Sequence, residues 1–214
     1  MTEIHLENTL PKVFAERTDI ESDVWKKPLT LKKGENYLIE AASGTGKTSL
    51  CSFLMGQRKD YLGIIRFDNS DLSKLKISDW TKIRRHHLSC IFQEMRIFSE
   101  LSAWDNVIIK NNLTNHKTEA EISDWFDMLG LKEKKEQLAG KMSQGQQQRV
   151  ALMRSLVQPF DFLIADEPVS HLDDENSRIM AEIIMEEAKK NGAGLVVTSI
   201  GKRMPLNYDK ILKL

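Results

Sequence analysis

The sequence lacks long hydrophobic runs, and cysteine is scarce. No stretch approaches the about 18 apolar residues of a membrane-spanning helix, so we expect no such helix in this chain. The first residues show neither the charged nor the apolar segment of a secretory signal peptide, and none is expected. Cys51 and Cys90 are isolated, which favours buried thiols in a reducing compartment over a disulfide framework or a metal site.

An excess of charge of one sign is also missing. The 31 basic residues balance the 31 acidic residues, and the formal net charge is +0. A broad basic surface is therefore not expected, and neither is a nucleic-acid partner. The sequence contains no internal repeat and no low-complexity segment. At 214 residues the chain is long enough to bury a full core, and we predict a single domain over residues 1–214.

Short apolar runs alternate with helical patterns along the chain. The runs predict strands at residues 37–41, 61–67, 88–92, 162–165 and 195–198. Apolar residues at helical spacing predict helices over residues 48–55, 119–129 and 174–190. A strand, a crossover helix and a further strand form a parallel sheet, so the predicted class is α/β. We expect a strand-rich part over about 1–92, a helical lobe over about 93–145, and a continuation of the core over 146–214.

Residues 41–48 read Ala-Ala-Ser-Gly-Thr-Gly-Lys-Thr and lie between a predicted strand and a predicted helix. Glycines in such a turn let backbone N–H groups approach phosphates, Lys47 would meet the β- and γ-phosphates, and the Thr48 hydroxyl would bind Mg²⁺. The other residues that this loop would present to a nucleotide are Ser43, Gly44, Thr45, Gly46 and Ser49. Because Ala41 stands where the strict pattern has glycine, a Gly-rich turn with a surface lysine is the alternative.

Two carboxylates follow the apolar run at residues 162–165. Ligands bind at the carboxyl edge of parallel sheets, so Asp166 and Glu167 are expected beside the phosphate loop. Asp166 would hold Mg²⁺ directly or through water, and Glu167 would orient and deprotonate the water that attacks the γ-phosphate. An acidic turn after a core strand is the alternative.

The residues Met142-Ser143-Gln144-Gly145-Gln146 open an amphipathic helix. This run resembles the Leu-Ser-Gly-Gly-Gln signature of ATP-binding cassette (ABC) proteins, although an ordinary helix N-cap with a Gln-rich first turn would read similarly. The resemblance implies a P-loop NTPase core with a mostly parallel sheet, an antiparallel β lobe and an inserted α-helical lobe. Within the family, the chain looks most like the lipoprotein-release, macrolide-efflux and cell-division subgroup.

The resemblance also implies that part of the site serves a second subunit. Ser143, Gly145 and Gln146 would contact the ATP held by a partner cassette. Ser170-His171-Leu172-Asp173 resembles the D-loop, in which Asp173 would lie near the partner's nucleotide, although Asp173 is equally suited to cap the following helix. His171 is interpreted as a surface or interface residue rather than a base.

Two further site residues are implied by position. Gln93 follows Ile91-Phe92 and resembles the Q-loop glutamine, which would contact Mg²⁺ or the attacking water. Phe14 is the candidate for the aromatic that stacks on adenine, whereas Trp25 is interpreted as a core anchor of the β lobe. The apolar residues Met95, Ile97 and Phe98 either receive a membrane subunit or fill the helical lobe, and Trp104 and Val107 are expected in the core.

One position departs from the family pattern. The strand at 195–198 should lead into a histidine that contacts the γ-phosphate, and Ser199 stands there instead. Serine can donate a hydrogen bond, so Ser199 is kept as a catalytic candidate, but it cannot carry a positive charge. No histidine follows His171.

The resulting hypothesis is an ATP-hydrolysing subunit that forms a head-to-tail dimer, homomeric or heteromeric, and powers a separately encoded integral membrane subunit. Such a protein would be cytoplasmic and peripheral on the inner face of the membrane, with ATP and Mg²⁺ as cofactors. The alternative is an ATP-gated dimerising module in which Ser199 makes hydrolysis slow or absent. A third class, soluble ABC proteins that act on ribosomes or DNA, is disfavoured because the chain has no room for a second cassette or a long coiled-coil insert.

Overall fold

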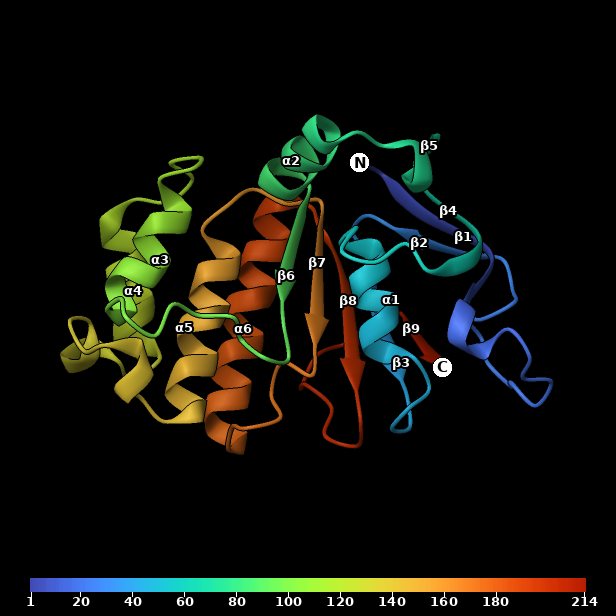
Figure 1. Cartoon of the computed structure of the whole chain (residues 1–214). Coiled ribbons are helices and arrows are strands. Elements are labelled where there is room, and N and C mark those ends of the chain that lie inside the picture. The colour runs from blue at the N-terminus through green and yellow to red at the C-terminus, as the bar shows by residue number, and fades with distance from the viewer.

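A parallel five-stranded sheet forms the centre of the molecule. The computed structural model describes residues 1–214. The sheet order is β6-β7-β8-β3-β9, and each neighbouring pair is parallel. Its strands are β3 (Asn36–Glu40), β6 (Leu88–Ile91), β7 (Phe162–Asp166), β8 (Gly194–Ser199) and β9 (Lys210–Lys213). Because the strands run in one direction, their carboxyl ends meet at one edge, the lower edge in Figure 1.

A smaller antiparallel sheet forms the β lobe beside this core. Its order is β2-β1-β4-β5. Its strands are β1 (Glu3–Pro11), β2 (Leu29–Lys32), β4 (Tyr61–Phe67) and β5 (Ser70–Asp71). The central pair, β1 and β4, changes register between Glu7 and Leu10, so β1 bends there. A short 3-10 helix, Lys12–Phe14, directly follows β1 and carries the chain toward the edge where the central strands end.

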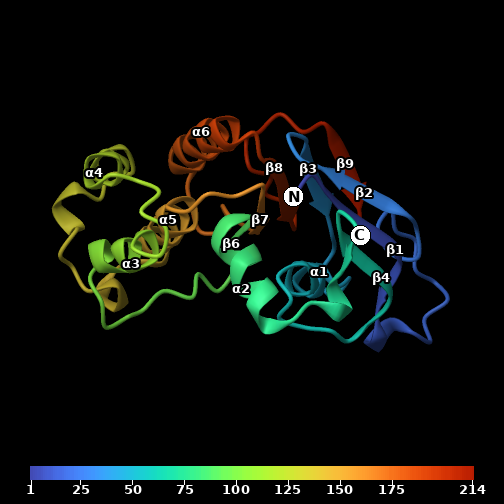
Figure 2. The same ribbon diagram turned by 90° about the horizontal axis from the view of Figure 1, so that it is seen from above.

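Helices cover both faces of the central sheet and form a separate lobe. They are α1 (Lys47–Leu54), α2 (Ile77–His86), α3 (Ala103–Asn111), α4 (Glu119–Met128), α5 (Gln144–Leu156) and α6 (Asp174–Asn191). Seen from above, α5 and α6 lie on one side of the sheet, α1 and α2 lie on the other, and α3 and α4 extend beyond α5 (Figure 2). None of these helices combines the length and the apolar character needed to cross a bilayer.

The alternation of side chains along the central strands divides the core into two. Leu163 of β7 belongs to the core shared with α5, α6 and the helical lobe, whereas its neighbour Ile164 belongs to the core shared with α1 and the β lobe. Val197 and Val196 of β8 divide in the same way. A strand buried on both faces must be apolar at every position, which explains the unbroken apolar runs of the sequence.

The predicted elements largely match the observed ones, and the α/β class with a β lobe and a helical lobe is confirmed. Val107 and Trp104 pack in the helical-lobe core as expected, Val107 fully and Trp104 partly buried. Met95 is buried, whereas Phe98 is 49 % exposed. The observed α2 and β9 had no counterpart among the predicted elements.

Candidate active site

The turn between β3 and α1 has the geometry of a phosphate-binding loop. Gly46 precedes α1 with a φ of 99°. A Cβ added there would lie 3.0 Å from the Phe14 ring and 3.2 Å from the Trp25 ring. The left-handed backbone therefore favours glycine at this position, and the two rings leave little room for a side chain. The turn directs the N-terminus of α1, with its free N–H groups, toward the carboxyl edge of the sheet.

Trp25 holds this loop from the β-lobe side. The side chain is only 2 % exposed and belongs to the β-lobe core, so the interpretation of Trp25 as a core anchor is confirmed. Its indole Nε1 also donates a hydrogen bond to the Thr45 carbonyl at 2.9 Å. Sequence reasoning missed this second role, because nothing in the local pattern links residue 25 to residue 45.

One pocket brings most of the predicted nucleotide residues together. The cavity has a volume of about 340 Å³ and lies at the N-terminus of α1. It is lined by Phe14, Ser43, Gly44, Gly46, Lys47, Thr48, Ser49, Gln93, Glu167 and Ile200. Phe14 thus stands at the loop, with the Arg17 guanidinium 5.3 Å from its ring centroid. The Ser49 hydroxyl accepts a hydrogen bond from Arg58 at 2.9 Å.

The two charged groups of the pocket contact each other. The Lys47 ammonium forms an ion pair with the Glu167 carboxylate, and both side chains are largely buried, at 7 % and 13 % exposed. The lysine predicted to bind phosphate and the glutamate predicted to act as base therefore come from distant parts of the sequence to the same point. An ion pair in such a shielded position is stronger than one at the surface, provided that both partners are satisfied.

Glu167 has an unusual backbone. Its φ is +50°, which is uncommon for a residue other than glycine, asparagine or aspartate. Its N–H donates to the Thr198 carbonyl at 3.3 Å, and its own carbonyl accepts a bond from Gln148 Nε2 at 3.3 Å. A strained conformation that surrounding groups fix is frequent at functional sites, because it places a side chain where regular structure would not.

The oxygen groups near Lys47 suit a magnesium ion that phosphates also hold. Asp166 is 3 % exposed, and its Oδ1 accepts a hydrogen bond from the Thr198 hydroxyl at 2.5 Å. Thr48 and Gln93 line the pocket at the start of α1, whereas Asp166 is not among the lining residues. No group of three His, Cys, Asp or Glu side chains is placed to hold a metal by itself. This sparse oxygen set fits Mg²⁺, which keeps several waters and is usually bound through one or two carboxylates plus substrate phosphates.

The signature residues lie outside this pocket. Ser143 caps α5: its hydroxyl accepts the Gln146 N–H at 3.3 Å, and the Gln146 side chain accepts the Ser143 N–H at 2.9 Å. Ser143 is therefore an N-cap, and this role is compatible with the resemblance of residues 142–146 to the family signature. A Cβ on Gly145 would lie 3.1 Å from the His171 carbonyl oxygen, so this glycine permits close packing of α5 on residues 170–173.

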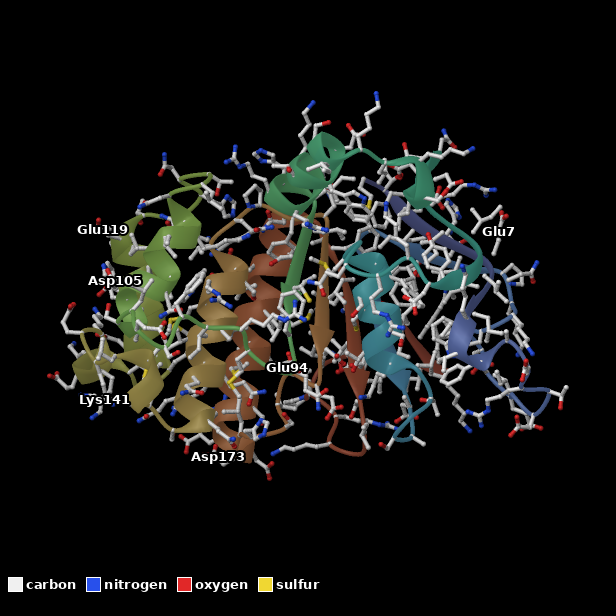
Figure 3. The ribbon with its side chains drawn as sticks, viewed as in Figure 1. Glu7, Glu94, Asp105, Glu119, Lys141 and Asp173 are labelled. Carbon is white, nitrogen blue, oxygen red and sulfur yellow. The ribbon has the colours of Figure 1, made fainter.

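Asp173 is the N-cap of α6. Its carboxylate accepts the Asn176 N–H at 2.8 Å, and this bond lowers the pKa of Asp173. Figure 3 shows Asp173 at the lower end of α6, at the edge where the central strands also end. His171 is exposed, in line with its interpretation as a surface or interface residue.

Ser199 does not take the position expected of a catalytic group. Its side chain is 3 % exposed, and its hydroxyl donates to the Lys202 carbonyl at 2.7 Å. Ser199 does not line the pocket; the next residue, Ile200, does. The hydroxyl is therefore committed within its own loop, and the geometry does not support the catalytic role that was expected of it.

A second cleft lies between the core and the helical lobe. It has a volume of about 450 Å³, and its apolar lining includes Phe92, Phe98, Ile109 and Leu113. Its charged lining residues are all cations: Arg84, Arg96, Lys110 and Arg154. Burial lowers the pKa of Lys110, and the neighbouring Arg154 and Arg85 lower it further. The cleft thus concentrates positive charge on a chain that is neutral overall.

The parallel sheet, the glycine turn at the start of α1, and the Lys47 and Glu167 side chains together define a P-loop nucleotide-binding protein. The comparisons with known proteins make this more specific. The family model described as "ABC transporter" matches residues 26–170. The chain belongs to the ABC transporter family, and it is an ATP-binding ATPase of the ABC type.

The similar proteins are ATP-binding components. The chain is 30 % identical over 195 residues to the lipoprotein-releasing system ATP-binding protein LolD of Francisella tularensis, covering 87 % of this chain and 82 % of that protein. It is 28 % identical to the macrolide export ATP-binding/permease protein MacB of a Shewanella species, of which it covers 29 %. A dimeric bacterial ABC transporter cassette, MJ0796, matches with a TM-score of 0.75 and 25 % identity over 92 % of this chain and 87 % of that chain.

Proposed function

We propose that this chain is the ATP-hydrolysing subunit of a transporter-type complex, and that it works as a head-to-tail dimer. The supporting observation is the separation of its nucleotide residues into two groups. Lys47, Gln93 and Glu167 share one pocket, whereas Ser143 and Gly145 lie outside it at the start of α5. Because the signature residues do not line the pocket of their own chain, we propose that they contact the ATP bound by a second cassette.

The proposed reaction uses the phosphate-binding loop, the oxygen ligands for Mg²⁺ and Glu167 together. Backbone N–H groups of the loop and the Lys47 ammonium bind the β- and γ-phosphates. Mg²⁺, when bound by Thr48, Gln93 and Asp166, would neutralise charge on the phosphates. Glu167 accepts a proton from the water as that water attacks the γ-phosphate in line with the leaving ADP oxygen. Phe14, which lines the pocket, would stack on the adenine.

The charged cleft is the proposed docking site of the membrane subunit. An apolar lining in which every charged residue is a cation favours a helix that presents apolar side chains and at least one carboxylate. The Lys110 ammonium makes no hydrogen bond or ion pair within the chain, so Lys110→Glu should disturb the interface without disturbing the fold. Binding to a membrane subunit would place this chain in the cytoplasm at the inner face of the membrane.

Co-purification from detergent extracts tests the docking proposal. Wild type should retain a polytopic membrane protein, Lys110→Glu should lose about tenfold of it, and Lys134→Glu should retain it. Lys134 is an exposed lysine outside the cleft and serves as the matched control. Equal recovery with all three chains would contradict docking at this cleft.

ATPase measurements on the purified complex test the catalytic proposal. Glu167→Gln should abolish hydrolysis while ATP binding persists, because an amide cannot accept the proton. A wild-type complex that is as inert as Glu167→Gln would contradict the enzyme proposal.

The ATP-gated dimerising module remains the second candidate. The commitment of the Ser199 hydroxyl to the Lys202 carbonyl favours it, because no side chain of the family's histidine type faces the γ-phosphate. Ser199→His separates the candidates: faster hydrolysis in this variant would indicate that wild type is limited at this position, and unchanged hydrolysis would indicate that it is not.

A further inference from the structure

The loop that follows β8 carries two cations with different partners. Arg203 is bound to Glu40, with Nη2 and Oε1 2.5 Å apart. Lys202 instead reaches the start of α6. Its ammonium donates to the Leu172 carbonyl at 2.6 Å and lies 3.0 Å from Asp174 Oδ1.

The contact of Lys202 is one side of a double support for the segment that resembles the D-loop, residues 170–173. On the other side, the buried Gln148 of α5 accepts the His171 N–H at 3.3 Å. The same Gln148 donates to the carbonyl of Glu167. The segment is therefore held between the signature helix and the loop after β8, and it is linked to the backbone of the catalytic glutamate.

Ser199 takes part in this arrangement through the backbone. Its hydroxyl donates to the carbonyl of Lys202 at 2.7 Å, which fixes the residue whose ammonium binds Leu172. Asp174 is fully exposed, so its ion pair with Lys202 is screened by water and contributes little. The carbonyl of Leu172 is the more effective partner, and it belongs to the D-loop segment itself.

We propose that Lys202 is a positioning residue for ATP hydrolysis: it holds the D-loop segment through the Leu172 carbonyl and brings to this loop the positive charge that Ser199 does not carry. The assignment rests on the proposed ATPase function of the chain. It explains why a serine is compatible with this position: the serine orders the lysine, and the lysine orders the D-loop. The ammonium acts on the geometry of the dimer contact and does not touch the nucleotide.

Steady-state kinetics of the full-length chain in its membrane complex test the assignment. Lys202→Met should lower kcat about tenfold and leave KM for ATP unchanged, since Lys202 lies outside the pocket and affects only alignment. Lys202→Arg keeps the charge and should recover kcat to within about threefold. Lys210→Met is the matched control, because Lys210 pairs with Glu35 at 3.2 Å, away from the site, and it should behave as wild type.

Two further measurements separate positioning from a structural role. The thermal midpoint of Lys202→Met should equal that of wild type, because the bond that it loses is partly exposed. Asp174→Asn, which retains the Leu172 contact, should keep kcat within about twofold.

The kinetic and stability measurements can support or overturn the role assigned to Lys202. An unchanged kcat in Lys202→Met overturns the assignment, and so does a loss of kcat that Lys202→Arg fails to recover or that a lower thermal midpoint accompanies. If wild type itself neither binds nor hydrolyses ATP, the proposed function falls and the assignment falls with it. If wild type is active and Lys202→Met is equally active, the assignment alone is wrong.

Discussion

Replacing Trp25 by phenylalanine isolates the contribution of the β lobe to nucleotide binding. The substitution removes the Nε1–H that binds the Thr45 carbonyl at 2.9 Å and keeps an aromatic ring in a site that is 2 % exposed. A net hydrogen bond contributes about 1 kcal/mol, and the smaller ring leaves a void that costs about 1 kcal/mol more. We therefore expect a loss of about 2 kcal/mol in the free energy of unfolding.

The effect on ATP follows from the first of these terms. The bond to Thr45 stabilises the binding conformation of the loop. Removing about 1 kcal/mol of this stabilisation weakens ATP binding about fivefold. Titration with a fluorescent ATP analogue measures the dissociation constant, and chemical denaturation measures the stability. The two measurements together separate a loosened loop from a destabilised fold.

Trp104→Phe provides the matched control. Trp104 lies in the helical lobe, where its ring packs 5.7 Å from that of Phe126, and its indole is remote from the phosphate loop. This variant should bind ATP as wild type does. Wild-type affinity in Trp25→Phe, or an equal loss in Trp104→Phe, would refute the role assigned to the Thr45 contact.

Two further predictions concern the helix starts. Gly145→Ala should fold normally, because alanine is favoured over glycine in a helix by about 1 kcal/mol. Its Cβ would press on the His171 carbonyl, so ATP-driven dimerisation, measured by sedimentation, should weaken about tenfold while the monomer still binds ATP. Normal dimerisation of this variant would contradict the contact. At α4, the Thr118 backbone N–H lowers the pKa of Glu121 from 4.5 to about 2. Because the pKa of Glu121 is lower in the folded state than in the unfolded state, this stabilisation is present above about pH 4.5 and is lost as the pH falls toward 2. Wild type should be more stable than Glu121→Ala by about 0.5 kcal/mol after screening, and denaturation experiments should show this difference narrowing over that pH range. A difference that does not change with pH would contradict the role of the cap.

Regular patterns in the sequence predicted the central fold well. Strands that are buried on both faces must be apolar throughout, so β7 and β8 were predicted. The helix predicted over residues 174–190 is α6, which ends at Asn191 and is followed by Gly192 with a left-handed φ of 57°. By contrast, α2 buries only Trp80 and carries Asp79, Lys82, Arg84 and Arg85 among its other residues, so its apolar periodicity is weak. The strand β9 exposes most of its short length and pairs with a single neighbour, so its local sequence carries little signal.

The site was predictable where one segment carries the chemistry and not where distant segments meet. The loop that contains Lys47 was predicted from its glycines. Two contacts join distant segments through a single donor each: Trp25 to Thr45, and Lys202 to Leu172. A single donor gives no recognisable sequence pattern, so neither contact could be predicted. The role of Ser199 could not be predicted either, because the direction of a hydroxyl depends on the path of the loop that follows it.

The ion pair between Lys47 and Glu167 makes one ammonium the shared partner of two anions. A phosphate that binds Lys47 competes with the carboxylate, so binding is an exchange of partners, and the affinity for ATP includes the free energy of separating the pair. An amide at position 167 removes the competitor as well as the base. We therefore expect Glu167→Gln to retain ATP tightly for two independent reasons, slower hydrolysis and a freed lysine. A nonhydrolysable ATP analogue is sensitive only to the second and distinguishes them.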